Sequence, residues 1–167
     1  NNGNGTVTDN ATGLTWQKCS SGQNNDTSCS GSVTNSDWYA ANTYCGSLGL
    51  ASKTWRLPTR QELEFLADYG KGGPVIDTDY FPSTPWTPAA AYWSSTTAAD
   101  RMEGAWAVQF ESVYRHGYDK TFNNPYFYVR CVAGTTIGYA GNFIDNVNGT
   151  GKCQRSCRLI GGTTNEI

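Results

Sequence analysis

The stretch TWRLPTRQELEFLADYG, residues 54–70, is the most regular part of the sequence and decides how the fold is interpreted. Thr59 and Glu62 form the S/T-x-x-E pattern of a capping box, in which each side chain bonds a backbone N–H of the first helical turn. Pro58 restricts the backbone just before the helix, and Gly70 can end the helix. The stretch therefore predicts a helix. Three apolar residues are expected to face inward: Leu63, Leu66 and Ala67.

The charged residues of this stretch are expected to hold the fold rather than to perform chemistry. Arg56 lies between an aromatic residue and Leu57-Pro58, so we expect its guanidinium to stack and to bond loop carbonyl groups. Glu62 is used by the helix cap. Three further charged residues are predicted to form a solvated helix face: Arg60, Glu64 and Asp68.

Two elements are predicted before this helix. Residues 5–18, GTVTDNATGLTWQK, contain two short β-prone runs around a turn, which predicts a β-ribbon. Ser36 is placed to cap a first helix, and Gly46 and Gly49 are available to end it. The apolar residues of this helix recur at helical spacing: Trp38, Ala41, Cys45 and Leu48.

Strands are predicted after the second helix. Residues 74–88 contain four prolines and are too broken for regular structure, whereas residues 92–96 favour a strand. Residues 104–111 and 126–132 alternate apolar with other side chains, which is typical of half-buried strands in an antiparallel sheet. Residues 112–124 should project as a loop or a twisted hairpin. Segregated helices and strands indicate an α+β domain.

Composition narrows the classes of function. The chain has 167 residues, a formal charge of −2 and a pI near 5.3, which favour one acidic domain and argue against binding to nucleic acid or to an anionic membrane. No apolar run approaches the ~20 residues of a membrane span, and no signal peptide begins at Asn1. The sequence is thus expected to be a processed chain without a membrane span.

The cysteine count favours disulfides over a metal site. Six cysteines, an even number, accompany one histidine and four Asn-x-Ser/Thr triplets, which suits an exported protein with up to three disulfides. Residues 19–29 form a polar loop with little to pack, so a local Cys19–Cys29 bridge would close it.

Four motifs, in order, resemble a known bacterial family. They are GTVTDNATGLTWQK at 5–18, WRLPTRQEL at 55–63, YWSST at 92–96 and VRCV at 129–132. Together they are similar to the domain at the C-terminus of the Legionella collagen-like adhesin, over about residues 3–133.

The resemblance implies a fold, a role and a disulfide. The fold would be C-type lectin-like, in the variant shared with formylglycine-generating enzymes, with two helices packed on an antiparallel sheet and long irregular loops. Members act as surface adhesion modules, some toward sulfated glycans. The resemblance also implies a Cys45–Cys131 disulfide, which leaves Cys153 and Cys157 to pair locally.

Catalysis, metals and cofactors are not expected. Ser94, Ser95 and Thr96 lack a nucleophile motif, and His116 is the one histidine. The cysteines all have disulfide partners available, and the loop motifs of calcium-dependent lectins are absent. The chain is therefore expected to be non-enzymatic.

The resemblance to a lectin-like scaffold, which displays its ligand surface on long loops and adjoining strands, implies a ligand-binding surface near residues 101–120. Its candidate residues mix rings, which stack on sugar faces, with cations, which pair with acidic groups: Arg101, Tyr114, Arg115, His116, Tyr118 and Lys120. The partner would be a glycan or a surface protein. The same residues also fit a solvated hairpin with ordinary cross-strand aromatic pairs.

The tail, residues 134–167, repeats the opening of the chain. Asn1–Thr6 and Asp145–Thr150 are identical at four of six positions, as if a second copy of the domain began and stopped. The tail is expected to dock on its own sheet or on a neighbour's, through Phe143, Ile144 and Asp145. The prediction is an extracellular or cell-surface adhesion module, with a subunit of an extracellular homo-oligomer or filament as the alternative.

Overall fold

The computed structural model describes residues 1–122 and 126–136, which belong to the first of two units of the chain, Asn1–Thr136. The predicted tail contacts and the last predicted disulfide lie outside the described residues and stay predictions. They concern Phe143, Ile144, Asp145, Cys153 and Cys157. The proposed domain boundary after Ala133 is likewise a prediction.

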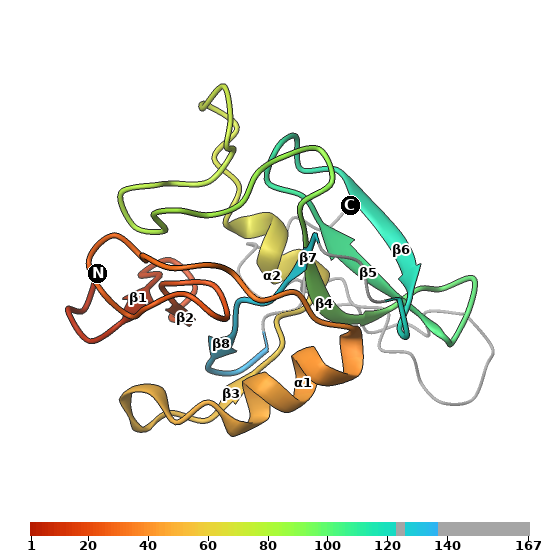
Figure 1. Ribbon diagram of the computed structural model, residues 1–167, viewed down its shortest axis with the longest axis horizontal. Helices are drawn as coiled ribbons and strands as arrows, with labels where there is room; N and C mark the ends of the chain where they lie inside the picture. Colours follow the sequence, from red (N-terminus) through yellow and green to blue (C-terminus); the bar gives the residue numbers. More distant parts are fainter. Residues whose placement is uncertain (123–125, 137–167) are drawn as a thin grey trace, which may run out of the picture. The chain divides into compact units, whose positions relative to one another are not determined.

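The described residues form an α+β fold with two sheets, as predicted (Figure 1). The first sheet has the order β1-β2-β8-β3, and its neighbours are antiparallel. Its strands are β1 (Thr6–Thr8), β2 (Thr15–Gln17), β8 (Val132–Ala133) and β3 (Trp55–Arg56). Since β1 and β2 pair directly, the predicted N-terminal ribbon is confirmed.

The second sheet has the order β6-β5-β4-β7. Its strands are β6 (Arg115–Asp119), β5 (Gly104–Val108), β4 (Ala91–Thr97) and β7 (Phe127–Tyr128). Residues 112–124 were expected to project as a loop or a twisted hairpin, but they contain β6, which joins the sheet by pairing with β5 over five residues. The expectation of a wholly antiparallel sheet was wrong, because β7 runs parallel to β4.

The single strand predicted at residues 126–132 divides between the two sheets. β7 belongs to the second sheet and β8 to the first. Between them the backbone bonds to the N-terminal segment: Val129 accepts from Ser21 N–H at 2.9 Å, and Cys131 accepts from Gln17 N–H at 2.9 Å. The chain can change sheets here because other backbone groups replace the lost ladder bonds.

The first helix, α1, spans Trp38–Ser47 and buries Ala41 and Cys45. Its N-cap is Asp37, whose carboxylate accepts a 2.8 Å hydrogen bond from Ala40 N–H, and the prediction of Ser36 was wrong. Ser36 is held in the preceding extended segment. Its N–H donates to the Phe127 carbonyl group, and its own carbonyl accepts from the Trp93 indole.

The second helix, α2, spans Arg60–Phe65 and begins with the predicted capping box. Thr59 accepts from Glu62 N–H at 3.2 Å, and Glu62 accepts from Thr59 N–H at 2.8 Å. Leu63 is fully buried as expected, while Leu66 and Ala67 are half-buried. The helix ends well before Gly70, because Ala67 already pairs with Ile76 in an isolated β-bridge.

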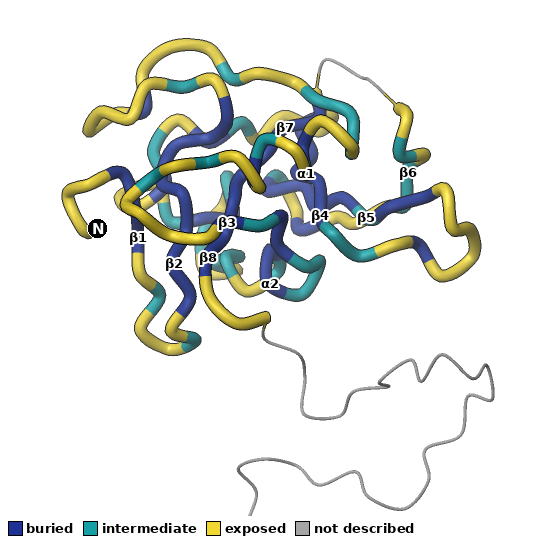
Figure 2. Tube along the Cα trace, turned by 90° about the horizontal axis from the view of Figure 1, so that it is seen from below, coloured by how far each residue is buried: buried dark blue, intermediate teal, exposed yellow. Residues whose placement is uncertain are grey.

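The core lies between α1 and the two sheets, where the dark blue segments of Figure 2 gather. Ala105 and Ala107 of β5 face this core, and Val108 is buried on the opposite face, so β5 is not the half-buried strand that its alternation predicted. Of the five β5 residues, Trp106 alone is half-exposed.

The described residues contain two disulfides. Cys45 of α1 is bonded to Cys131, and Cys19 is bonded to Cys29, so both of these predicted pairs are confirmed. Cys45 and Cys131 belong to the buried core. The resemblance supplied the first pair, and the polar character of the 19–29 loop supplied the second.

Candidate ligand-binding site

The predicted ligand-binding residues gather on the hairpin formed by β5 and β6. β6 is an edge strand among the described residues, so one of its backbone edges is not covered by a neighbouring strand. Three candidates lie in β6, two flank it, and one lies in the connection between β4 and β5. The three in β6 are Arg115, His116 and Tyr118. Tyr114 and Lys120 flank the strand, and Arg101 lies in the β4–β5 connection.

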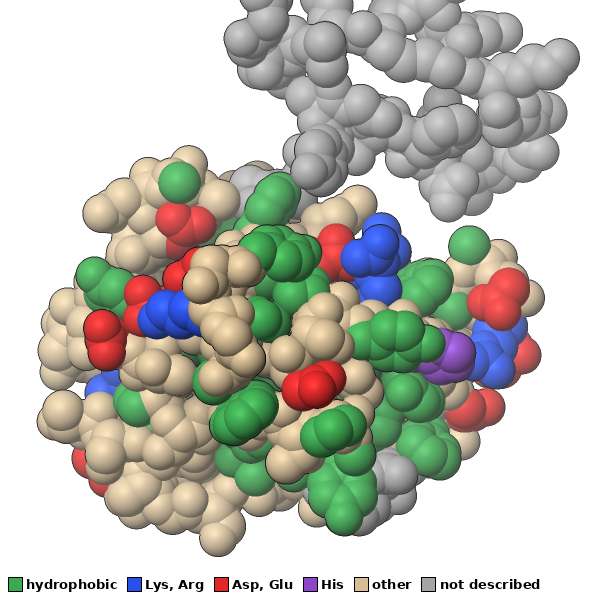
Figure 3. Space-filling view, turned by 90° about the horizontal axis from the view of Figure 1, so that it is seen from above, with side chains coloured by type: hydrophobic (Ala, Val, Ile, Leu, Met, Phe, Trp, Pro, Cys, Tyr) green, Lys and Arg blue, Asp and Glu red, His purple; other side chains and the backbone are tan. Residues whose placement is uncertain are grey.

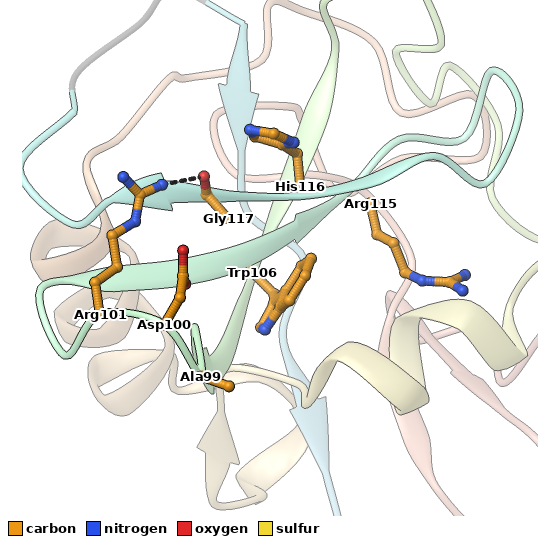
Figure 4. Close-up of a pocket in the computed structure, with 7 residues that line it drawn as sticks. All are labelled: Ala99, Asp100, Arg101, Trp106, Arg115, His116 and Gly117. Atoms are coloured by element: carbon orange, nitrogen blue, oxygen red, sulfur yellow. Dashed lines mark hydrogen bonds between the residues drawn. The ribbon is translucent and has the colours of Figure 1, made fainter.

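The β6 residues divide between two faces of the sheet. His116 pairs with Ala107 and therefore shares a face with the core alanines, whereas Arg115 pairs with Val108 on the opposite face. Figure 4 shows the His116 and Arg115 side chains leaving the strand on different sides. The structure thus separates candidates that the sequence grouped together.

An aromatic row, made of Tyr114, His116, Tyr118 and Phe122, follows one face of the hairpin. Successive ring centroids lie 6.2, 5.0 and 5.9 Å apart, and the first and last pairs are nearly parallel. Tyr114 is 55% exposed and Phe122 is 41% exposed. In Figure 3 the histidine, in purple, lies beside exposed hydrophobic side chains, in green.

The centre of the aromatic row is anchored on the core. The Tyr118 ring packs edge-on against Phe127 at 4.6 Å. Partial burial, with a smaller contribution from Tyr114, raises the pKa of Tyr118 above its usual value, so its hydroxyl stays protonated at neutral pH. Tyr118 therefore presents a neutral ring with a polar tip at the centre of the row.

The side chains of Lys120 and Arg101 already interact with other groups of the protein. The Lys120 ammonium lies 4.6 Å from the Trp38 ring and donates to the Met102 carbonyl group at 2.8 Å. Arg101 donates through Nη2 to the Gly117 carbonyl group at 2.5 Å. Both cations therefore fix the connection between β4 and β5 against β6.

Arg115 is the more available cation on the second face of the hairpin. Its side chain is 51% exposed, and its Nε lies 3.6 Å from a Glu64 carboxylate oxygen. The same oxygen lies 3.6 Å from Arg60 Nε, and the Arg60 guanidinium stacks on the Trp106 ring at 5.2 Å. The predicted solvated helix face is therefore wrong: Arg60 and Glu64 are half-buried, and Asp68 follows the end of α2.

A hollow of about 300 Å³, called here the Trp106 hollow, opens on this second face. In Figure 4 the Trp106 side chain lies between Arg101 and Arg115. The lining residues are Ala99, Asp100, Arg101, Trp106, Arg115, His116 and Gly117. The sequence prediction did not include Trp106, Asp100 or Gly117 among the candidate residues. The pairing of Trp106 with Gly117 depends on the register of β5 and β6, which the sequence alone does not supply.

Metal-ligating clusters, free thiols and helices able to cross a membrane are all absent from the described residues. In residues 1–122 and 126–136, no cluster of three His, Cys, Asp or Glu side chains could hold a metal ion. All four cysteines in these ranges are in disulfides. In the same part of the chain, no helix has the length and apolar character needed to cross a membrane.

Comparison with known proteins identifies the family. No curated protein matches the sequence. The family model described as the Lcl C-terminal domain matches residues 5–133, which include both sheets, both helices and both described disulfides. The chain therefore belongs to the Lcl C-terminal domain family.

Proposed function

We propose that this chain is an extracellular, non-enzymatic adhesion module that binds a glycan through the aromatic row. The observation that carries the proposal is the row itself, in which Tyr114, His116, Tyr118 and Phe122 present adjacent rings on an edge hairpin. Rings stack on the apolar faces of sugars, and hydroxyl tips bond their polar edges. A surface protein is the alternative ligand.

Family membership and disulfides support the extracellular, adhesin-like part of the proposal. The Lcl C-terminal domain family covers most of the chain. Disulfides persist in oxidising compartments, and here they link the first helix to the core and close the 19–29 loop. Both features suit a domain that works outside the cell.

The structural roles of several reactive side chains support the non-enzymatic part of the proposal. The described cysteines are bonded to one another, and Glu62 holds the α2 cap and pairs with Arg56. His116 lies between Tyr114, on which it stacks, and Tyr118, which it meets edge-on. These groups have structural partners, so we assign the exposed rings to binding.

A glycan array tests the proposal directly. The full chain should bind a defined set of glycans, and Tyr114→Ala should weaken this binding about tenfold because a stacking ring is lost. Tyr69→Ala is the matched control, since Tyr69 is also exposed but lies outside the hairpin. Silence across the array, or equal effects of the two substitutions, would refute the role of the row.

A structural subunit of a filament is the second candidate. β1 is at the edge of the first sheet among the described residues, which leaves an edge where a neighbour's strand could add. Ile144→Asp in the full chain should then abolish assemblies seen by sedimentation velocity and negative-stain microscopy. If both the unsubstituted chain and the Ile144→Asp variant are monomers, the filament function is refuted.

A further inference from the structure

Gly117 leaves part of the Trp106 indole uncovered on the second face of the hairpin, where the Arg60 guanidinium also lies 5.2 Å from the ring. The two residues are cross-strand partners, and a glycine has no side chain with which to cover the ring. A Cβ at position 117 would lie 3.2 Å from that of Ala98, so the space is already limited. Trp106 remains half-exposed and lines the hollow. Because Arg60 lies over the indole, the arrangement leaves one ring face for stacking by a flat or ring-shaped group.

The charges around the Trp106 hollow favour a ligand with one negative charge. Its lining contains two cations, Arg101 and Arg115, and one anion, Asp100. Arg101 already bonds the Gly117 carbonyl group. Arg115 has Glu64 at 3.6 Å, beyond good hydrogen-bond distance, so its guanidinium fork is available to an acidic group.

We propose that the Trp106 hollow binds a single sugar ring that carries one carboxylate, as in a hexuronic acid. The sugar's C–H face stacks on Trp106, its carboxylate pairs with Arg115, and its hydroxyl groups donate to Asp100. About 300 Å³ is at the lower end of ligand pockets, which matches one ring rather than a long segment.

Each lining group selects against a simpler ligand. A neutral sugar leaves the fork of Arg115 without an acceptor. A flat aromatic acid satisfies Trp106 and Arg115 but gives Asp100 no hydrogen-bond donor. A planar carboxylate also matches the two parallel donors of an arginine.

This inference rests on the proposed function in one respect, that the β5–β6 hairpin faces the ligand. It concerns the opposite face from the aromatic row, so the two surfaces can be tested separately. His116, which borders the hollow, directs its side chain to the other side of β6 (Figure 4).

The experiment compares methyl β-glucuronide with methyl β-glucoside on the full chain. Binding is measured by saturation-transfer NMR and by tryptophan fluorescence. The glucuronide should bind about tenfold more tightly, because a charge-assisted bidentate pair is added. Arg115→Ala should remove this difference. Arg115→Lys should restore only part of it, because lysine keeps the charge but not the fork.

Lys53→Ala is the matched control, since it removes an exposed cation outside the hollow. Equal binding of the two sugars, no binding of either, or an equal loss in Lys53→Ala and Arg115→Ala would overturn the inference. Glycan binding that depends on Tyr114 would survive all three outcomes, so a failure here is distinct from a failure of the proposed function.

Discussion

Arg56 and Glu62 form a two-pronged ion pair, with Nη1 2.7 Å from Oε2 and Nη2 2.7 Å from Oε1. The Glu62 side chain is fully buried, and it also accepts from Thr59 N–H. Arg56 donates in addition to the carbonyl groups of Gly134 and Leu57, which confirms its predicted bonding to loop carbonyls. The pair links β3, the cap of α2 and the chain that leaves β8.

Glu62→Ala should lower the free energy of unfolding by about 3 kcal/mol, because it breaks a buried ion pair and a helix cap together. Glu64→Ala is the control, since its carboxylate lies 3.6 Å from two partly exposed arginines and should contribute about 1 kcal/mol or less. Urea unfolding measures both. Equal losses would contradict the importance of the Arg56–Glu62 pair.

The two disulfides should stabilise the protein unequally. Cys45 and Cys131 are separated by 86 residues, and Cys19 and Cys29 by 10. Loop-closure entropy assigns about 4–5 kcal/mol to the first bridge and about 2–3 kcal/mol to the second. Urea unfolding of the two double-alanine variants should show this order, and the reverse order would contradict it.

Arg130 is a fully buried cation without an acidic partner among the described residues. Its guanidinium stacks on Phe81 at 4.7 Å and Tyr92 at 5.4 Å, and Nη2 donates to Thr84 and Ser20 hydroxyls. Nε and Nη1 have no hydrogen-bond partner. Burial lowers the pKa of Arg130 below its usual value.

Replacement of Arg130 should depend on charge rather than on size. Arg130→Met should change the unfolding free energy by only about 1 kcal/mol, because an apolar group avoids the desolvation cost. Arg130→Lys should cost about 2–3 kcal/mol, because the charge stays buried and its planar stacking is lost. Thermal and urea unfolding compare the variants; a methionine variant less stable than the lysine variant would refute this account.

Asp26 should titrate near pH 2. The side chain of Ser30, then its backbone N–H, and more weakly Ser28 hydrogen-bond the carboxylate and lower the pKa from 3.8 to about 2. A lowered pKa means that this loop conformation is favoured above about pH 3.8 and loses that support as pH falls toward 2.

NMR titration of side-chain carboxyl carbons checks this prediction. Ser30→Ala should raise the pKa of Asp26 toward 3.8. The pKa of Asp119, which is lowered by Thr121, should not change and serves as the control. An unchanged Asp26 titration in Ser30→Ala would contradict the assignment.

Elements fixed by neighbouring residues were predictable from the sequence. The α2 capping box involves Thr59 and Glu62 alone, and it is present as expected. The choice of Asp37 over Ser36 as the α1 cap was not local, since Ser36 bonds Phe127 and Trp93 far along the chain. Adjacent residues of equal capping ability are separated only by such tertiary contacts.

The site was predictable in part. Composition located the β5–β6 hairpin, but it could not divide His116 from Arg115, because the faces of β6 depend on its register with β5. Trp106 was missed because small residues, Ala105 and Ala107, fill the crowded core side and leave the large ring outside. Large side chains are not always the inward ones in a strand covered on both faces.

The position of Cys131 also determines how the domain would respond to a pulling force. A load applied to the chain beyond Thr136 acts first on β8, which is flanked by β2 and β3. It then acts on Cys131, the residue before β8, which is covalently linked to Cys45 of α1. Strands pulled lengthwise must lose several backbone bonds at once, and the disulfide does not yield at such forces. Residues 46–130 are therefore shielded from tension by a covalent bypass between Cys45 and Cys131.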